Sequence, residues 1–123
     1  MPIKTKRWDD PVEADDGVRI LICRYRPRAL RKEEETRDEW LPALAPSPAL
    51  HSAAYGKRGN ALAWPTYRTL YLREMQSQMR LVHELAERAR SGETLTLLCS
   101  SACTREARCH RSLLRELIEA ELV

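Results

Sequence analysis

The sequence lacks any long run of apolar residues. No segment approaches the roughly 18 consecutive apolar residues that a membrane-spanning helix needs, so we expect no membrane helix. The basic residues Lys4, Lys6 and Arg7 are not followed by an apolar stretch, so the start of the chain does not resemble a secretory signal. These two absences favour a soluble protein of the cytoplasm.

The sequence also lacks internal repeats and the composition of a disordered chain. Hydrophobic residues make up 43% and charged residues 32% of its 123 residues, which is too apolar for disorder. This length supports one hydrophobic core but not two independent ones. We therefore expect a single α/β domain spanning residues 1–123.

Four cysteines are present, at positions 23, 99, 103 and 109. Because no secretory signal is recognised, we expect them to be reduced thiols rather than disulfides. Reactive, metal-binding and inert roles all remain open for them.

The formal net charge of +3 is modest, but positive charge is concentrated after residue 23. Arg24, Arg26 and Arg28 surround Tyr25, a combination chemically suited to phosphate, carboxylate or nucleic acid through bidentate contacts and stacking. The alternative is a solvated loop that pairs with the acidic residues 33–35.

Alternating or continuous apolar residues predict three strands. Residues 3–7 alternate apolar and polar side chains, whereas residues 18–25 and 94–99 contain uninterrupted apolar runs. The run at 20–23 indicates a central strand covered on both faces, and we expect the first two strands to be neighbours.

Helical patterns separate and follow these strands. Thr36 and Glu39 are spaced as a capping box, which predicts a short helix over residues 36–41, and residues 44–60 are expected to be mainly irregular. A long helix, kinked within its length, is predicted from Pro65 to Ala89, and a last helix over residues 105–122.

Strands that alternate with helices favour a mainly parallel sheet flanked by helices, in a Rossmann-like three-layer arrangement. Ligands of such sheets bind at the carboxyl ends of the strands. The loop over residues 24–28 and the loop over residues 99–105 both leave strands at that edge, so we expect the site there.

An ordered series of short motifs runs through nearly the whole chain. It comprises Lys6-Arg7, Asp16-Gly17-Val18-Arg19-Ile20-Leu21, Arg24, Pro27-Arg28, Asp38-Glu39-Trp40-Leu41, Leu44-Ala45-Pro46-Ser47, Trp64, Tyr71 and Leu97-Leu98. This series resembles the YeaO-like proteins, a domain of unknown function, so the resemblance implies a fold but no mechanism.

Near the second strand the chain departs from the family pattern, which resembles Asp-Arg-x-Trp-Pro-Arg-Gly. Residues 23–29 read Cys-Arg-Tyr-Arg-Pro-Arg-Ala, so both arginines are kept while the acidic, tryptophan and glycine positions differ. Cys99 followed by Cys109-His110-Arg111 is similar to the Cys…Cys-His-Arg version of related members.

Cys99 and Arg105, separated by five residues, lie between a predicted strand and a predicted helix. This placement suits a thiolate enzyme acting on an oxyanion, because a helix N-terminus favours the thiolate and an arginine grips the anion. The intervening loop contains no glycine, however, whereas tight phosphate cradles commonly use one. The alternative makes Cys99 a small residue that ends a buried strand and Cys109 part of the apolar stripe of the last helix.

Cys99, Cys103, Cys109 and His110 have the softness that zinc prefers in its ligands. The spacing argues against a zinc site, however, because structural zinc sites usually contain short Cys-x(2–4)-Cys knuckles in turn-rich segments. In addition, adjacent residues on a helix, as Cys109 and His110 are expected to be, point about 100° apart. We therefore expect no metal and no cofactor.

The candidate site thus has Cys99 as a catalytic residue and five ligand-binding residues, Arg24, Arg28, Arg105, His110 and Arg111. The function expected is binding of a small anionic ligand or an acidic partner. The alternative is a cysteine-dependent enzyme, phosphatase-, reductase- or sulfurtransferase-like, that uses Cys99 on an anionic substrate. A third interpretation places His110 at the edge of the core and Arg111 in solvent. In that case the protein is an interaction or scaffold domain that binds no ligand.

Sequence-specific nucleic-acid binding is not expected, because the sequence has no recognisable nucleic-acid-binding motif and its pI is only about 8.8. The sequence does not predict an oligomeric state.

Overall fold

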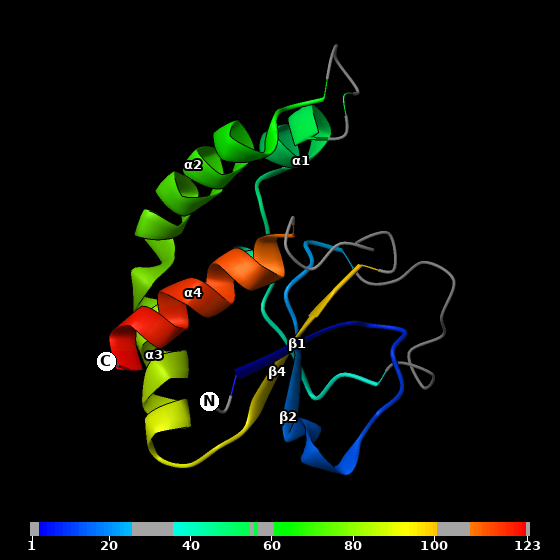
Figure 1. Cartoon of the computed structure of the whole chain (residues 1–123), viewed down its shortest axis with the longest axis vertical. Helices are drawn as coiled ribbons and strands as arrows, with labels where there is room; N and C mark the ends of the chain where they lie inside the picture. The colour runs from blue at the N-terminus through cyan, green and yellow to red at the C-terminus, as the bar shows by residue number, and fades with distance from the viewer. Residues whose placement is uncertain (1–2, 26–35, 55, 57–60, 101–108, 123) are drawn as a thin grey trace.

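The computed structural model describes residues 3–25, 36–54, 56, 61–100 and 109–122. Its strands are β1 (Ile3–Arg7), β2 (Val18–Leu21), β3 (Glu39–Trp40) and β4 (Leu95–Cys99). Its helices are α1 (Pro48–Ala54), α2 (Trp64–Met75), α3 (Met79–Arg90) and α4 (His110–Leu122), with short 3-10 turns η1 (Ala14–Asp16), η3 (Pro42–Leu44) and η4 (Gln76–Gln78). Figure 1 shows how these elements are arranged.

The strands form one sheet in the order β1-β4-β2-β3, and each neighbouring pair is parallel. This confirms the expected small α/β fold, and the arrangement is consistent with three layers. The expectation that β1 and β2 are neighbours is wrong, because β4 lies between them. All five residues of β4 are buried, so this most apolar strand takes an interior position where both of its edges are paired.

The helical core lies against one face of β4. Side chains alternate along a strand, so Leu95, Leu97 and Cys99 share a face. Leu95 and Leu97 belong to the hydrophobic core that includes Leu113 and Leu114 of α4. Helix α4 contacts β1 and β4 as well as α2 and α3, and in Figure 1 it lies between α2 and the strands. The fold therefore brings the end of β4 close to the start of α4.

The other face of the sheet carries the buried side chains of Leu21 and Leu98 together with a polar cluster around Asp16. The carboxylate of this buried residue accepts hydrogen bonds from Lys4 Nζ at 2.8 Å and from Arg19 Nη1 at 2.5 Å, and it pairs with Lys6 Nζ at 2.8 Å. Thr96 Oγ1 of β4 donates to the Asp16 carbonyl at 2.6 Å. Lys4, Lys6 and Arg19 therefore all pair with the same buried carboxylate.

The helix predicted over residues 36–41 is wrong, since Glu39 and Trp40 form strand β3 beside β2. The Asp38 N–H donates to the Arg19 carbonyl at 2.7 Å, and the Leu41 N–H donates to the Leu21 carbonyl at 2.9 Å. Pairing with a strand some 20 residues away in sequence therefore overrides the local capping signal.

Other predicted elements differ mainly at their ends. Strand β2 ends at Leu21 rather than at residue 25, and residues 44–60, expected to be mainly irregular, contain α1. The long predicted helix is interrupted by η4, which confirms the kink. Among the described residues, no helix is long and apolar enough to span a membrane.

Candidate functional site

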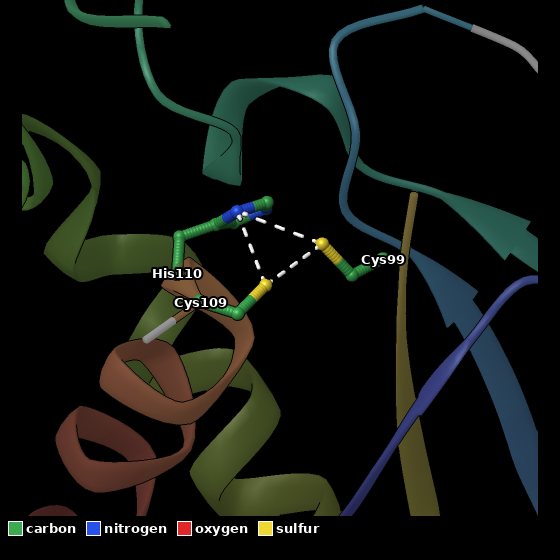
Figure 2. Close-up of side chains that lie close together, drawn as sticks. All are labelled: Cys99, Cys109 and His110. Atoms are coloured by element: carbon green, nitrogen blue, oxygen red, sulfur yellow. Dashed lines mark hydrogen bonds between the residues drawn. The ribbon is translucent and has the colours of Figure 1, made fainter. Parts of the chain in front are cut away.

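Three side chains converge where β4 ends and α4 begins. Cys99 is the last residue of β4, Cys109 immediately precedes α4, and His110 is its first residue. Cys99 Sγ lies 2.9 Å from Cys109 Sγ, and His110 Nδ1 lies 3.8 Å from the former and 3.9 Å from the latter. Figure 2 shows the two sulfur atoms and the ring directed at a common point. We call these residues the thiol–imidazole cluster.

The orientation of His110 follows from its second ring nitrogen. Nε2 lies 2.9 Å from the backbone carbonyl oxygen of Ile22, just beyond the end of β2. A carbonyl oxygen only accepts hydrogen bonds, so Nε2 carries the proton. In the neutral imidazole, Nδ1 then presents its lone pair to both sulfur atoms.

Tyr71 packs against the histidine ring and is itself held in place. Its ring centroid lies 5.7 Å from that of His110, and its hydroxyl donates to the Leu44 carbonyl at 2.8 Å. Burial raises the pKa of Tyr71 well above its ordinary value, so the hydroxyl stays a donor. The Tyr71 ring, held by the hydrogen bond of its hydroxyl, therefore packs beside the imidazole of the cluster.

The two thiols are not bonded to each other, because a disulfide requires a sulfur–sulfur distance of about 2.05 Å. Cys99 is fully buried and Cys109 is 3% exposed. Both therefore agree with the expectation of buried cysteines, but the structure adds that they face each other and His110. One S–H group can donate to the other sulfur atom at this separation.

Arg111, the second residue of α4, is buried rather than solvated, with 6% of its surface exposed. Within the described part of the chain, its Nε has no hydrogen-bond partner and no residue forms an ion pair with its guanidinium. Burying a charge is costly unless it is paired. The interpretation that placed Arg111 in solvent is wrong, because α4 turns this side chain inward.

Arg24 is engaged by the backbone. Its Nε donates to the Pro46 carbonyl at 3.1 Å, and Nη2 donates to the Ala45 carbonyl at 3.4 Å. It therefore fixes the segment that follows η3. Arg28, Arg105 and Cys103 lie outside the described residues, and their roles stay predictions.

The expectation of no metal rested in part on Cys109 and His110 both lying within a helix. In the structure Cys109 precedes α4, so the angle between successive helical residues does not apply. The donor atoms of Cys99, Cys109 and His110 all lie within 4.8 Å of one another. The sequence signal for this arrangement is a Cys-His pair at a strand-to-helix turn together with a cysteine that ends the strand.

A second group of potential ligands, Glu13, Asp15 and Asp16, also lies close together. The carboxylates of this group already form ion pairs with lysine ammonium groups. Lys4 pairs with Asp15 and Asp16, and Lys6 pairs with Glu13 and Asp16. Burial alone would raise the pKa of Asp16, but hydrogen bonds from Lys4, Lys6 and Arg19 and from the Glu13 backbone hold it well below its usual range. This group is a salt-bridge cluster of the fold.

The chain is similar to known proteins over nearly its full length. A family model described as the active DUF488-N3 subclade matches residues 3–122. The chain belongs to the DUF488 family. A further relative of this DUF488 chain is the Escherichia coli K12 protein named "Uncharacterized protein YeaO", 36% identical over 104 residues, which are 85% of this chain and 87% of that protein. The resemblance to YeaO-like proteins is thereby confirmed. No solved structure matches the chain.

Proposed function

We propose that this DUF488 chain binds a small oxyanion at the start of α4, with Arg111 as its anchor. The observation that carries the proposal is the buried side chain of Arg111, whose Nε has no hydrogen-bond partner among the residues that the structure describes. An arginine fork matches the paired oxygen atoms of phosphate, sulfate or carboxylate groups, and such an anion would compensate the buried charge.

The location supports the same conclusion. Helix α4 has 13 residues, and its N-terminus lies beside the carboxyl end of β4. The helix dipole favours negative charge at that end, and the carboxyl edge of a parallel sheet is where α/β folds collect ligands. In this proposal Arg111 takes the role of main anion ligand, and Arg24 has the structural role of holding residues 45–46.

Isothermal titration calorimetry tests the proposal by measuring the Kd of inorganic phosphate, sulfate and acetate for the wild-type chain and for Arg111→Gln. We expect at least one of these anions to bind the wild type, and Arg111→Gln to weaken that binding by about tenfold or more, the loss of one charge-assisted contact. Arg80→Gln is the matched control, because Arg80 is 91% exposed and lies on α3. Equal binding by Arg111→Gln, or no binding of any of the three anions, would contradict the proposal.

The thiol–imidazole cluster favours a second candidate function, a cysteine-dependent enzyme that acts on the bound anion. His110 Nδ1 is oriented to accept a proton from Cys99, and a thiolate is the nucleophilic form of cysteine. The family model's description as an active subclade agrees with this candidate.

Alkylation kinetics test the second candidate. Iodoacetamide at pH 6 is expected to modify Cys99 faster than the half-buried Cys23, and phosphate is expected to slow the reaction at Cys99 only. His110→Asn removes the base and should bring the rate at Cys99 down to that of Cys23. If Cys99 reacts no faster than Cys23 in the wild type, the enzyme is rejected and the anion-binding function stands.

A further inference from the structure

We propose that Cys99, Cys109 and His110 bind one Zn²⁺ ion through the two sulfur atoms and Nδ1. The proposal goes beyond anion binding and uses residues other than Arg111. Two thiolates and an imidazole form a donor set that zinc prefers. Binding would replace both thiol protons, which are released to solvent, so that the metal–sulfur bonds form without any change of oxidation state.

The distances fit a tetrahedral ion with one small adjustment. Zinc bonds of about 2.3 Å to sulfur and 2.0–2.1 Å to nitrogen place sulfur and nitrogen ligands roughly 3.5 Å apart and two sulfur ligands roughly 3.8 Å apart. The observed sulfur–nitrogen distances are 3.8 and 3.9 Å, close to the first value. The sulfur–sulfur distance of 2.9 Å must open by about 0.9 Å, which a small side-chain rotation of Cys109 provides.

The outer contacts of His110 are those of a metal ligand. A zinc-binding histidine usually donates its other ring N–H to a carboxylate or a backbone carbonyl, which fixes the tautomer and the ring orientation. Here Nε2 donates to the Ile22 carbonyl at 2.9 Å, so Nδ1 is presented to the ion in its unprotonated form. The Tyr71 ring restricts the imidazole from another side.

Burial favours the metal over bare thiolates. Cys99, Cys109 and His110 are 0%, 3% and 7% exposed. Two thiolates buried without a cation would leave uncompensated negative charge in a low-dielectric interior. One Zn²⁺ with two thiolates and a neutral imidazole carries no net charge, so the complex suits this environment. A tetrahedral ion would take a fourth ligand in addition to these three.

The test combines metal titration with thiol footprinting. The wild-type chain, reduced with a phosphine and freed of metal, is titrated with Zn²⁺ against a chromogenic chelator, and Co²⁺ is used as the spectroscopic probe. We expect one ion per chain and, with Co²⁺, a thiolate charge-transfer band together with the intense visible bands of a tetrahedral centre. Cys99→Ser and Cys109→Ser should weaken Zn²⁺ binding by more than the roughly 10- to 100-fold that loss of an outer contact costs.

Two control variants separate the zinc site from Cys23 and from the anion site. Cys23→Ser removes a cysteine outside the cluster and should leave Zn²⁺ affinity unchanged. Arg111→Gln should also keep Zn²⁺ affinity while losing the anion, so failure of the anion proposal and failure of the zinc proposal are distinguishable.

Footprinting keeps the test valid if a cysteine variant does not fold, because it needs only the wild-type chain. Zn²⁺ should protect Cys99 and Cys109 from alkylation, with no protection of Cys23. Unchanged alkylation of Cys99 and Cys109, protection confined to other cysteines, or a Cys99–Cys109 disulfide in protein never exposed to oxidant would overturn the proposal.

Discussion

At Arg111, burial and charge act against each other. The side chain is 6% exposed, and its Nε makes no hydrogen bond to any residue in the described ranges. A charge buried in this way destabilises the fold unless it is compensated. Arg111→Met keeps the aliphatic part of the side chain and removes the charge. We expect its free energy of unfolding, measured by urea in a buffer containing only chloride, to be unchanged or raised by up to about 4 kcal/mol.

The same variant should lose its response to anions. Saturating phosphate should raise the stability of the wild type by about 2.7 kcal/mol at 100 times its Kd and leave Arg111→Met unaffected. Arg80→Met, at an exposed position of α3, should respond to phosphate as the wild type does. A strongly destabilised Arg111→Met in chloride buffer would mean that Arg111 has a partner within the chain, contrary to its assigned role.

At the scale of elements, the join between η1 and β2 depends on Gly17. Its φ is +64°, and a Cβ at this position would lie 2.2 Å from the Thr94 carbonyl oxygen. That oxygen accepts the Val18 N–H at 2.9 Å, which is where β2 begins to pair beside β4. Gly17→Ala must therefore move backbone, and we expect it to lower the free energy of unfolding by more than about 3 kcal/mol.

Gly92→Ala is the control for the backbone conformation alone. Gly92 has a φ of +108°, but no atom of the described residues lies within 4 Å of the position that an added Cβ would take. The loss of stability in this variant should therefore be only about 1–3 kcal/mol, the cost of the unusual φ. Urea unfolding of both variants measures the difference, and equal losses would show that the contact with Thr94 is not limiting.

Elements with a strong local signal were predictable from the sequence, whereas those set by long-range pairing were not. The apolar run of residues 95–99 and the periodicity of α3 and α4 indicated their structures correctly, because burial on both faces or on one stripe is encoded locally. Strand β3 has only two residues, and its identity comes from pairing with β2. Arg88 of α3 adds to this by donating to both carboxylate oxygens of Glu39, at 2.9 and 2.7 Å.

The candidate site shows the same division. Cys99, His110 and Arg111 could be named from their position near a strand end and a helix start. Their relation could not, because it depends on the place of Cys109 directly before α4 and on the Ile22 carbonyl that orients His110. Burial of Arg111 depends on how α4 packs against β1 and α2, which residue spacing within one helix does not determine.

For the whole molecule, the sheet has two differently stabilised faces. One face packs against the apolar helical core, and the other combines the buried Leu21 and Leu98 with the charges around Asp16. The carboxylate joins Lys4 and Lys6 of β1 to Arg19 of β2, so a single residue ties two strands separated by β4. Removing one partner of a buried ion pair typically costs about 3–5 kcal/mol. Asp16→Asn should therefore destabilise the protein by about that amount at neutral pH.

Because of these ion pairs, the free energy of unfolding should decrease as the pH falls into the acidic range. Although burial opposes it, the surrounding cations lower the pKa of Asp16 below its ordinary value of 3.8, so the unfolded chain binds the proton more readily than the folded chain. The stabilisation is fully present well above pH 3.8 and is lost as the pH falls below that value toward the folded pKa. Urea unfolding at a series of pH values should show a steep loss for the wild type in this range and a shallower one for Asp16→Asn. Asp15→Asn, whose side chain is 79% exposed, should follow the wild type, and identical slopes for wild type and Asp16→Asn would locate the acid sensitivity elsewhere.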